Sequence, residues 1–269
     1  MTIVMTYLFL AIVAAIAVWS ILKDPRDMAK LKSAPDTTAR QRILTRWMVQ
    51  SWAVFGLAAV AGLALTGNLA RLTDPILHLV DFDLVNSHGA GFVAGLVAAS
   101  LILVGLVAGQ IVSARRKARH ITLAEFEKMK TRYMVGDIAA LIPKNAAERR
   151  IGAGLSLAAG VNEELMFRAL LPALIFDACG GRFVWVAIAV SVVVFGLLHF
   201  YQGVAGVIGT TFLGAILMAI YLGTGNIFAP MAVHFLIDLR SLVLTSWIFE
   251  TAAKTISRLQ GASDGAPGV

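Results

Sequence analysis

Long apolar runs separated by polar segments dominate the chain. A helix that crosses about 30 Å of hydrocarbon needs about 20 apolar residues. Seven runs meet or approach that length: residues 2–22, 47–66, 89–113, 151–176, 183–200, 204–222 and 226–249. The pattern therefore predicts an all-α fold, a polytopic transmembrane helix bundle of seven to eight helices with a polar site inside it.

The composition supports a membrane protein. Hydrophobic residues make up 58% of the chain and charged residues 14%, with a mean hydropathy of +0.80. A soluble domain averages about 25% charged residues. We expect one integral membrane domain over residues 1–258 and a disordered tail over 259–269. No Lys or Arg precedes the first run, which favours a retained helix over a cleaved signal peptide.

The net charge of +7 reflects membrane topology rather than nucleic-acid binding. Lys and Arg concentrate in residues 23–46 and 114–150, whereas residues 67–88 carry one arginine and three aspartates. The positive-inside rule places the two basic segments in the cytoplasm, with the N-terminus outside and the C-terminus inside. The short loops favour a bacterial plasma membrane.

The second basic segment contains an amphipathic stretch, residues 122–141. Thr122 and Glu125 have the spacing of a capping box at the start of a helix. An interfacial helix that anchors the chain to the lipid bilayer is the favoured interpretation. A lip beside an active-site entrance is the alternative.

Three charged residues interrupt the fourth apolar run. Glu163, Glu164 and Arg168 lie among apolar residues, where each charge costs roughly 2.5–3.5 kcal/mol at a membrane helix centre. Glu164 and Arg168 are four residues apart and can form an ion pair. Glu163 points about 100° away on an ideal helix, which leaves it free for chemistry.

Two later runs carry histidines. His199 closes the fifth run, and His234 lies one helical turn before Asp238 in the seventh. Asp238 could hold the imidazole of His234 in one tautomer. A carboxylate with two imidazoles could activate water and stabilise an oxyanion, or bind a divalent metal. Each residue alone would be structural, but their occurrence on three apolar runs indicates a buried site. Residues 1–113 offer no comparable cluster, and the single cysteine, Cys179, allows no disulfide within the chain.

These residues resemble the motifs of a known family. Glu163-Glu164-Leu-Met-Phe-Arg168, Phe195-Gly-Leu-Leu-His199 and His234-Phe-Leu-Ile-Asp238 match its three motifs in order. The family is the CPBP family of CAAX proteases and bacteriocin-processing enzymes, also called Abi, and the resemblance covers roughly residues 150–245. It implies an intramembrane endopeptidase that acts on a membrane-associated protein or peptide.

The resemblance also implies roles. Glu163 with His199 would activate water, and His234 with Asp238 would form the oxyanion site. The type II CAAX prenyl proteases of this family usually have Asn at the position of Asp238. Asn can donate a hydrogen bond to an oxyanion, whereas an ionised Asp cannot. We expect no metal; if one is present, such as zinc, its ligands would come from Glu163, His199, His234 and Asp238.

Two other functions stay open from the sequence. The chain could be a non-catalytic immunity or scaffold protein of the same fold. It could also be a proton-coupled transporter, although the duplicated halves common in transporters are not seen.

Overall fold

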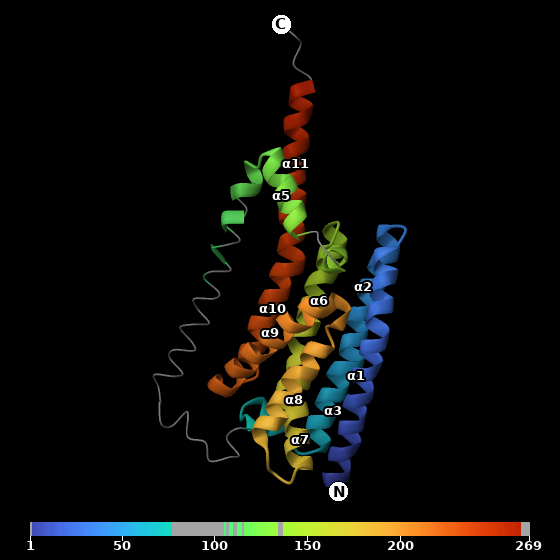
Figure 1. The fold of residues 1–269 in the computed structure, drawn as a ribbon, viewed down its shortest axis with the longest axis vertical. Coiled ribbons are helices and arrows are strands. Elements are labelled where there is room, and N and C mark those ends of the chain that lie inside the picture. The colour runs from blue at the N-terminus through green and yellow to red at the C-terminus, as the bar shows by residue number, and fades with distance from the viewer. Residues whose placement is uncertain are drawn as a thin grey trace.

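The structure is a computed structural model. It describes residues 2–76, 116–133 and 137–264, together with positions 105, 108–109 and 112–114. Throughout these residues the regular structure is helical (Figure 1). The predicted third span, residues 89–113, lies outside the described residues apart from the few positions just named.

The first half forms a helical hairpin. Helix α1 (Thr2–Lys32) is followed by α2 (Thr37–Gln50), which continues through the π-helical turn η1 (Ser51–Gly56) into α3 (Leu57–Leu65). Asp36 caps α2 by accepting a hydrogen bond from the Ala39 amide at 2.7 Å. Residues 23–46 are therefore mostly helix rather than the loop that the polar composition suggested.

A cluster of ion pairs around one buried carboxylate joins α1 to α2. Asp27 is 2% exposed and lies 2.8 Å from Lys23 Nζ, 3.0 Å from Lys30 Nζ and 3.1 Å from Arg46. The prediction that residues 1–113 bury no comparable charge cluster was wrong. The hydrophobic and polar pattern of the sequence does not reveal the cluster, because its members come from two helices that meet only after folding.

A second buried ion pair ties α2 to the second half. Arg40 contacts Glu148 at 3.2 Å, and Glu148 also accepts hydrogen bonds from Thr37 and from the Lys144 amide. Burial alone would raise the pKa of Glu148, but these hydrogen bonds hold that pKa below its usual value. The pair fixes α2 beside the start of the next helix.

The second half is built around one long central helix. It comprises α6 (Ala146–Glu164), the π-helical turn η5 (Leu165–Leu170) and α7 (Leu171–Ala178). The remaining elements are α8 (Val184–Leu197), the 3-10 turn η6 (Phe200–Gln202), α9 (Gly203–Thr224), α10 (Phe228–Leu239), the π-helical turn η7 (Arg240–Leu244) and α11 (Thr245–Asp264). Because α11 ends at Asp264, the helix enters the segment predicted as a disordered tail.

The buried core lies where the central helix meets its neighbours. Its largest members include Leu63, Phe167, Leu170, Phe195 and Tyr221, which come from α3, η5, α8 and α9. Helix α1 also packs against α3 and α7. The central helix therefore has protein on several sides, which allows it to hold charged groups.

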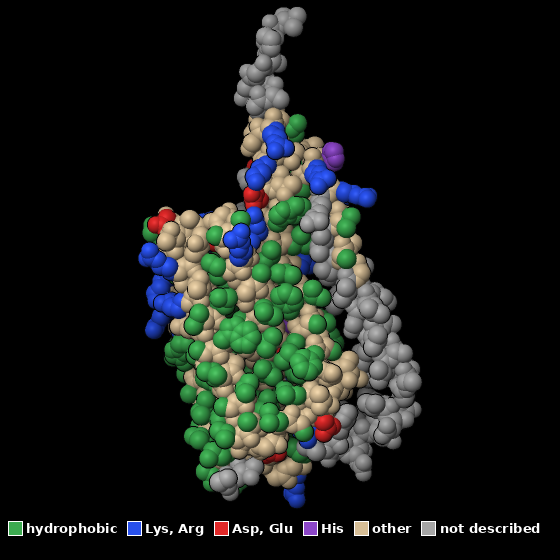
Figure 2. Space-filling view, turned by 180° about the vertical axis from the view of Figure 1, so that it is seen from behind, with side chains coloured by type: hydrophobic (Ala, Val, Ile, Leu, Met, Phe, Trp, Pro, Cys, Tyr) green, Lys and Arg blue, Asp and Glu red, His purple; other side chains and the backbone are tan. Residues whose placement is uncertain are grey.

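Among the residues that the structure describes, four helices are long and apolar enough to cross a membrane: Ile3–Lys32, Thr37–Leu65, Phe200–Thr224 and Phe228–Gln260. Hydrophobic side chains cover the middle of the face in Figure 2, and most of the Lys and Arg on that face lie toward the end from which α11 projects. The chain is therefore an integral membrane protein, and the number of crossings beyond these four stays a prediction.

The segment predicted as interfacial contains the short helix α5 (Leu123–Tyr133). The expected capping box is present: Thr122 N donates to Glu125 at 2.9 Å, and Glu125 N donates to Thr122 Oγ1 at 3.3 Å. Ala118 and Ile121, just before α5, pack with Ala252 and Ile256 of α11. α5 thus runs beside α11, beyond the helix bundle (Figure 1).

Topology can be tested from the two ends of the bundle. The start of α1 lies at one end, and the α1–α2 connection and the end of α11 lie toward the other (Figure 1). We expect Ser33→Cys and Thr73→Cys, each in a Cys179→Ser background, to react with impermeant thiol reagents from opposite sides, Ser33→Cys from the cytoplasm. Labelling of both positions from the same side would contradict this orientation.

Candidate active site

A close approach of two helix backbones brings the first and third motifs together. At Gly160 of α6, an added Cβ would lie 2.9 Å from the backbone nitrogen of Phe235 in α10. Any larger residue would push the helices apart. Glu164 is one turn beyond Gly160, and His234 precedes Phe235, so this crossing sets the spacing of the charged groups.

Glu164 connects its own helix to α10. Its Oε1 lies 2.7 Å from Nδ1 of His234, and its Oε2 lies 3.0 Å from Nε of Arg168. All three residues are buried. The Glu164–Arg168 ion pair expected from the sequence is present, and the guanidinium also stacks 4.3 Å above the ring of Phe195.

The partner of His234 differs from the one expected. Asp238 Oδ2 lies 3.8 Å from Nε2 of His234, too far for a hydrogen bond, and Glu163 Oε2 lies 4.0 Å from the same nitrogen. Glu164, not Asp238, therefore orients the imidazole. Spacing along one helix could not reveal this, because the contact crosses from α6 to α10.

His199 lies just after the end of α8, and its tautomer is fixed by the backbone. Its Nδ1 is 2.9 Å from the carbonyl oxygen of Phe195. A carbonyl only accepts, so Nδ1 carries the proton, and Nε2 of the neutral ring is a bare acceptor. The ring of Phe195 lies between the two histidines, with centroids 5.0 Å from His199 and 6.0 Å from His234.

Four of the six predicted site residues line one cavity of about 410 Å³: Glu163, His199, His234 and Asp238. Glu164 and Arg168 are not among its lining residues. The structure thus exposes four of the six predicted residues to the cavity. The other two, Glu164 and Arg168, lie outside the lining, where Glu164 contacts His234.

The first half of the chain supplies much of the cavity wall, which sequence reasoning missed. The lining residues from this half are Trp19, Ser20, Lys23, Asp24, Trp47, Gln50, Ser51 and Phe55. Tyr201 and Gln202 of η6 and Leu141 at the end of η4 (Asp137–Leu141) line it as well. Leu141 falls within the segment 122–141, so the end of that segment, rather than α5, borders the site. A charged pair at the end of the first apolar run, Lys23 and Asp24, was the one available signal.

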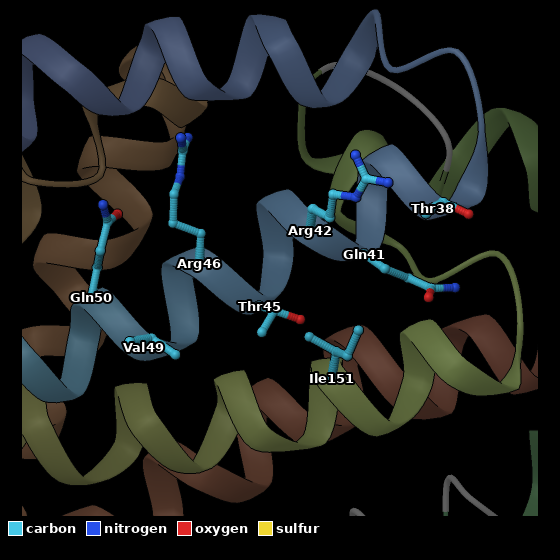
Figure 3. Close-up of a pocket in the computed structure, with 8 residues that line it drawn as sticks. All are labelled: Thr38, Gln41, Arg42, Thr45, Arg46, Val49, Gln50 and Ile151. Atoms are coloured by element: carbon cyan, nitrogen blue, oxygen red, sulfur yellow. The ribbon is translucent and has the colours of Figure 1, made fainter.

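A second pocket, of about 520 Å³, lies on the outer face of α2 (Figure 3). Its lining residues are Thr38, Gln41, Arg42, Thr45, Arg46, Val49, Gln50 and Ile151. None of them belongs to the three motifs. We therefore assign the chemistry to the cavity lined by the motif residues, although Gln50 borders both.

Acidic and histidine side chains are also common metal ligands. Within the described residues, no group of three or more His, Cys, Asp or Glu side chains is arranged to hold a metal ion. Glu164 accepts from Nδ1 of His234, and a backbone carbonyl accepts from Nδ1 of His199. These contacts leave Nε2 of each ring uncommitted, and metal-binding histidines commonly have their other nitrogen bonded in this way.

The geometry defines a membrane protein with paired carboxylates and histidines facing an internal cavity. Residues 149–240 match the family described as Rce1-like, type II CAAX prenyl endopeptidase Rce1-like. These residues are a domain of that family, within the CPBP group, and they contain all six motif residues. No curated protein matches the chain, and no solved structure matches it.

The buried ion pair gives a stability prediction. Arg168→Ala leaves the Glu164 carboxylate buried beside His234 without its permanent cation, and losing one partner of a buried pair costs about 3–5 kcal/mol. We expect a markedly lower unfolding midpoint in detergent. Arg182→Ala, at an exposed arginine, is the control and should stay near wild type. Equal midpoints for the two variants would show that the pair does not support the fold.

Proposed function

We propose that the protein is an intramembrane endopeptidase in which Glu163 and His199 activate a water molecule. Family membership of residues 149–240 suggests a protease. The observation that carries the mechanism is the pairing of two acceptors in one cavity: the Glu163 carboxylate and the bare Nε2 of His199. Both can take hydrogen bonds from the same water.

The proton balance is simple. Glu163 takes a proton from the water as the oxygen bonds to the scissile carbonyl carbon, and the carbonyl oxygen becomes an oxyanion. When the intermediate collapses, the carbon–nitrogen bond breaks and Glu163 returns the proton to the leaving nitrogen. His199 holds the water through Nε2 and accepts no net charge over the cycle.

The other motif residues support this step. Arg168 pairs with Glu164, and Glu164 holds Nδ1–H of His234. When His234 is protonated, Nε2–H faces the cavity near Glu163 and Asp238 and stabilises the developing oxyanion. Asp238 favours that protonated form and is the second carboxylate on the same side of the ring.

The substrate is a membrane-associated protein or peptide. The cavity has apolar walls from Trp19, Phe55, Leu155 and Leu213 around the carboxylates and histidines. An extended peptide would place its side chains on these walls while its scissile carbonyl meets the polar groups. We place the enzyme in a bacterial plasma membrane as one domain of seven to eight helices, with the N-terminus outside.

The central test is Glu163→Gln. The amide keeps the shape of the side chain but cannot accept the proton, so turnover should fall to background while the unfolding midpoint stays near wild type. Proteomics of cells carrying each form should find a membrane protein or peptide that accumulates uncleaved in the variant. Full activity of purified Glu163→Gln would exclude Glu163 as the base.

Measurements in proteoliposomes separate the alternative functions. An immunity or scaffold protein would show no hydrolysis in proteoliposomes and no loss on substitution of Glu163. A proton-coupled transporter would acidify or alkalinise the vesicle interior during uptake, which a peptidase would not do.

Metal content is tested separately. We expect active purified protein to contain zinc well below one atom per chain and to keep its activity in a chelator. The water is held between Glu163 and His199, so the proposed step needs no further group. Stoichiometric zinc, with activity lost to a chelator and restored by zinc, would replace this step with a metal-assisted one and leave the peptidase assignment intact.

A further inference from the structure

The hydrogen-bond capacity of the motif residues leaves the oxyanion short of donors. The one proton of neutral His199 is committed to the Phe195 carbonyl, and Nδ1–H of His234 is committed to Glu164. Ionised Glu163 and Asp238 only accept. His234 therefore supplies one donor at most, and only while it is protonated. A developing oxyanion is stabilised best by several donors fixed in place beforehand.

Tyr201 offers the missing donor. Its side chain lines the cavity, and its ring lies 5.9 Å from the His199 ring at an interplanar angle of 30°. The Tyr201 hydroxyl accepts a hydrogen bond from Gln202 Nε2 at 2.9 Å. That contact uses a lone pair of the oxygen, and the hydroxyl proton has no acceptor among the described residues.

We propose that Tyr201 donates its hydroxyl proton in a hydrogen bond to the oxyanion, with Gln202 as the positioning residue that orients the hydroxyl. This inference rests on the proposed peptidase function. Tyr201 follows the second motif by two residues, so the same turn that presents His199 to the water presents the phenol to the carbonyl oxygen.

Two other donors in the cavity wall are already engaged. Thr210 donates to the Gly206 carbonyl at 2.8 Å, and Trp47 Nε1 donates to Asp27 at 3.3 Å. Ser51 accepts from Asn162 at 3.1 Å and keeps its own proton. Ser51 is the competing donor, but only Tyr201 also packs its ring against a histidine of the motifs.

The test uses the purified full chain and a peptide that the wild-type protein cleaves. Tyr201→Phe should lower kcat about 100- to 1,000-fold, the loss typical of one oxyanion donor. KM should change little, because the interaction exists only in the transition state. A phosphinic peptide, whose anionic oxygen mimics the oxyanion, should bind Tyr201→Phe more weakly by a similar factor. The uncleaved peptide should bind Glu163→Gln equally with and without the tyrosine hydroxyl.

Tyr221→Phe is the matched control. Tyr221 is buried, and its hydroxyl donates to the Arg71 carbonyl, outside the cavity lining. Removing that hydroxyl should leave kcat unchanged. Gln202→Leu is the second variant, in case Tyr201→Phe folds poorly. It should lower kcat by a smaller factor, about tenfold, and should add nothing to Tyr201→Phe because both act through one hydroxyl.

The outcomes separate the two proposals. A wild-type protein that hydrolyses no peptide refutes the proposed function, and the role of Tyr201 with it. An active wild type with unchanged kcat in Tyr201→Phe and Gln202→Leu refutes the role of Tyr201 alone. A selective kcat loss in Ser51→Ala, with Tyr201→Phe unaffected, assigns the donor to Ser51 instead.

Discussion

The rest of the site depends on a single buried carboxylate shared between a guanidinium and an imidazole. Glu164 touches Arg168 on its own helix and His234 on α10. Glu164 pairs with the guanidinium of Arg168 through one carboxylate oxygen, and its other oxygen accepts the hydrogen bond from Nδ1 of His234. The carboxylate on one helix thereby fixes the tautomer of a histidine on another. The same arrangement explains why a guanidinium that is 2% exposed can be tolerated so deep in the bundle.

That contact requires the backbones to meet in a particular way. Gly160 lets α6 approach α10, and the π-helical turn η5 follows Glu164 immediately. Such turns occur mainly as single insertions in longer helices and often at functional sites. Here the turn carries Arg168, so the helix geometry and the ion pair belong to the same few residues.

The sequence predicted the helical class, the membrane setting and the six motif residues, because charges inside apolar runs are conspicuous. It could not predict contacts between helices. The spacing of His234 and Asp238 suggested that Asp238 orients the imidazole, whereas Glu164 does so from seventy positions away. The cluster around Asp27 was missed for the same reason. Its charges belong to a basic segment in the sequence, and they come together only because α1 and α2 pack side by side.

Different parts of the chain supply the motif residues and the cavity wall that faces them. The six motif residues lie within residues 149–240, but the wall that faces them includes α1 and α2 residues such as Trp19, Lys23 and Trp47. Lys23 reaches Asp24 and Asp27 and lies 4.8 Å from the ring of Trp19, so this part of the wall is itself held by charge and ring contacts. In the proposed peptidase, changes in that wall would alter which peptide fits while Glu163 and His199 stay in place. Under this proposal, substrate choice varies through α1 and α2, and the groups proposed for hydrolysis are held by the contacts of α6 and α10.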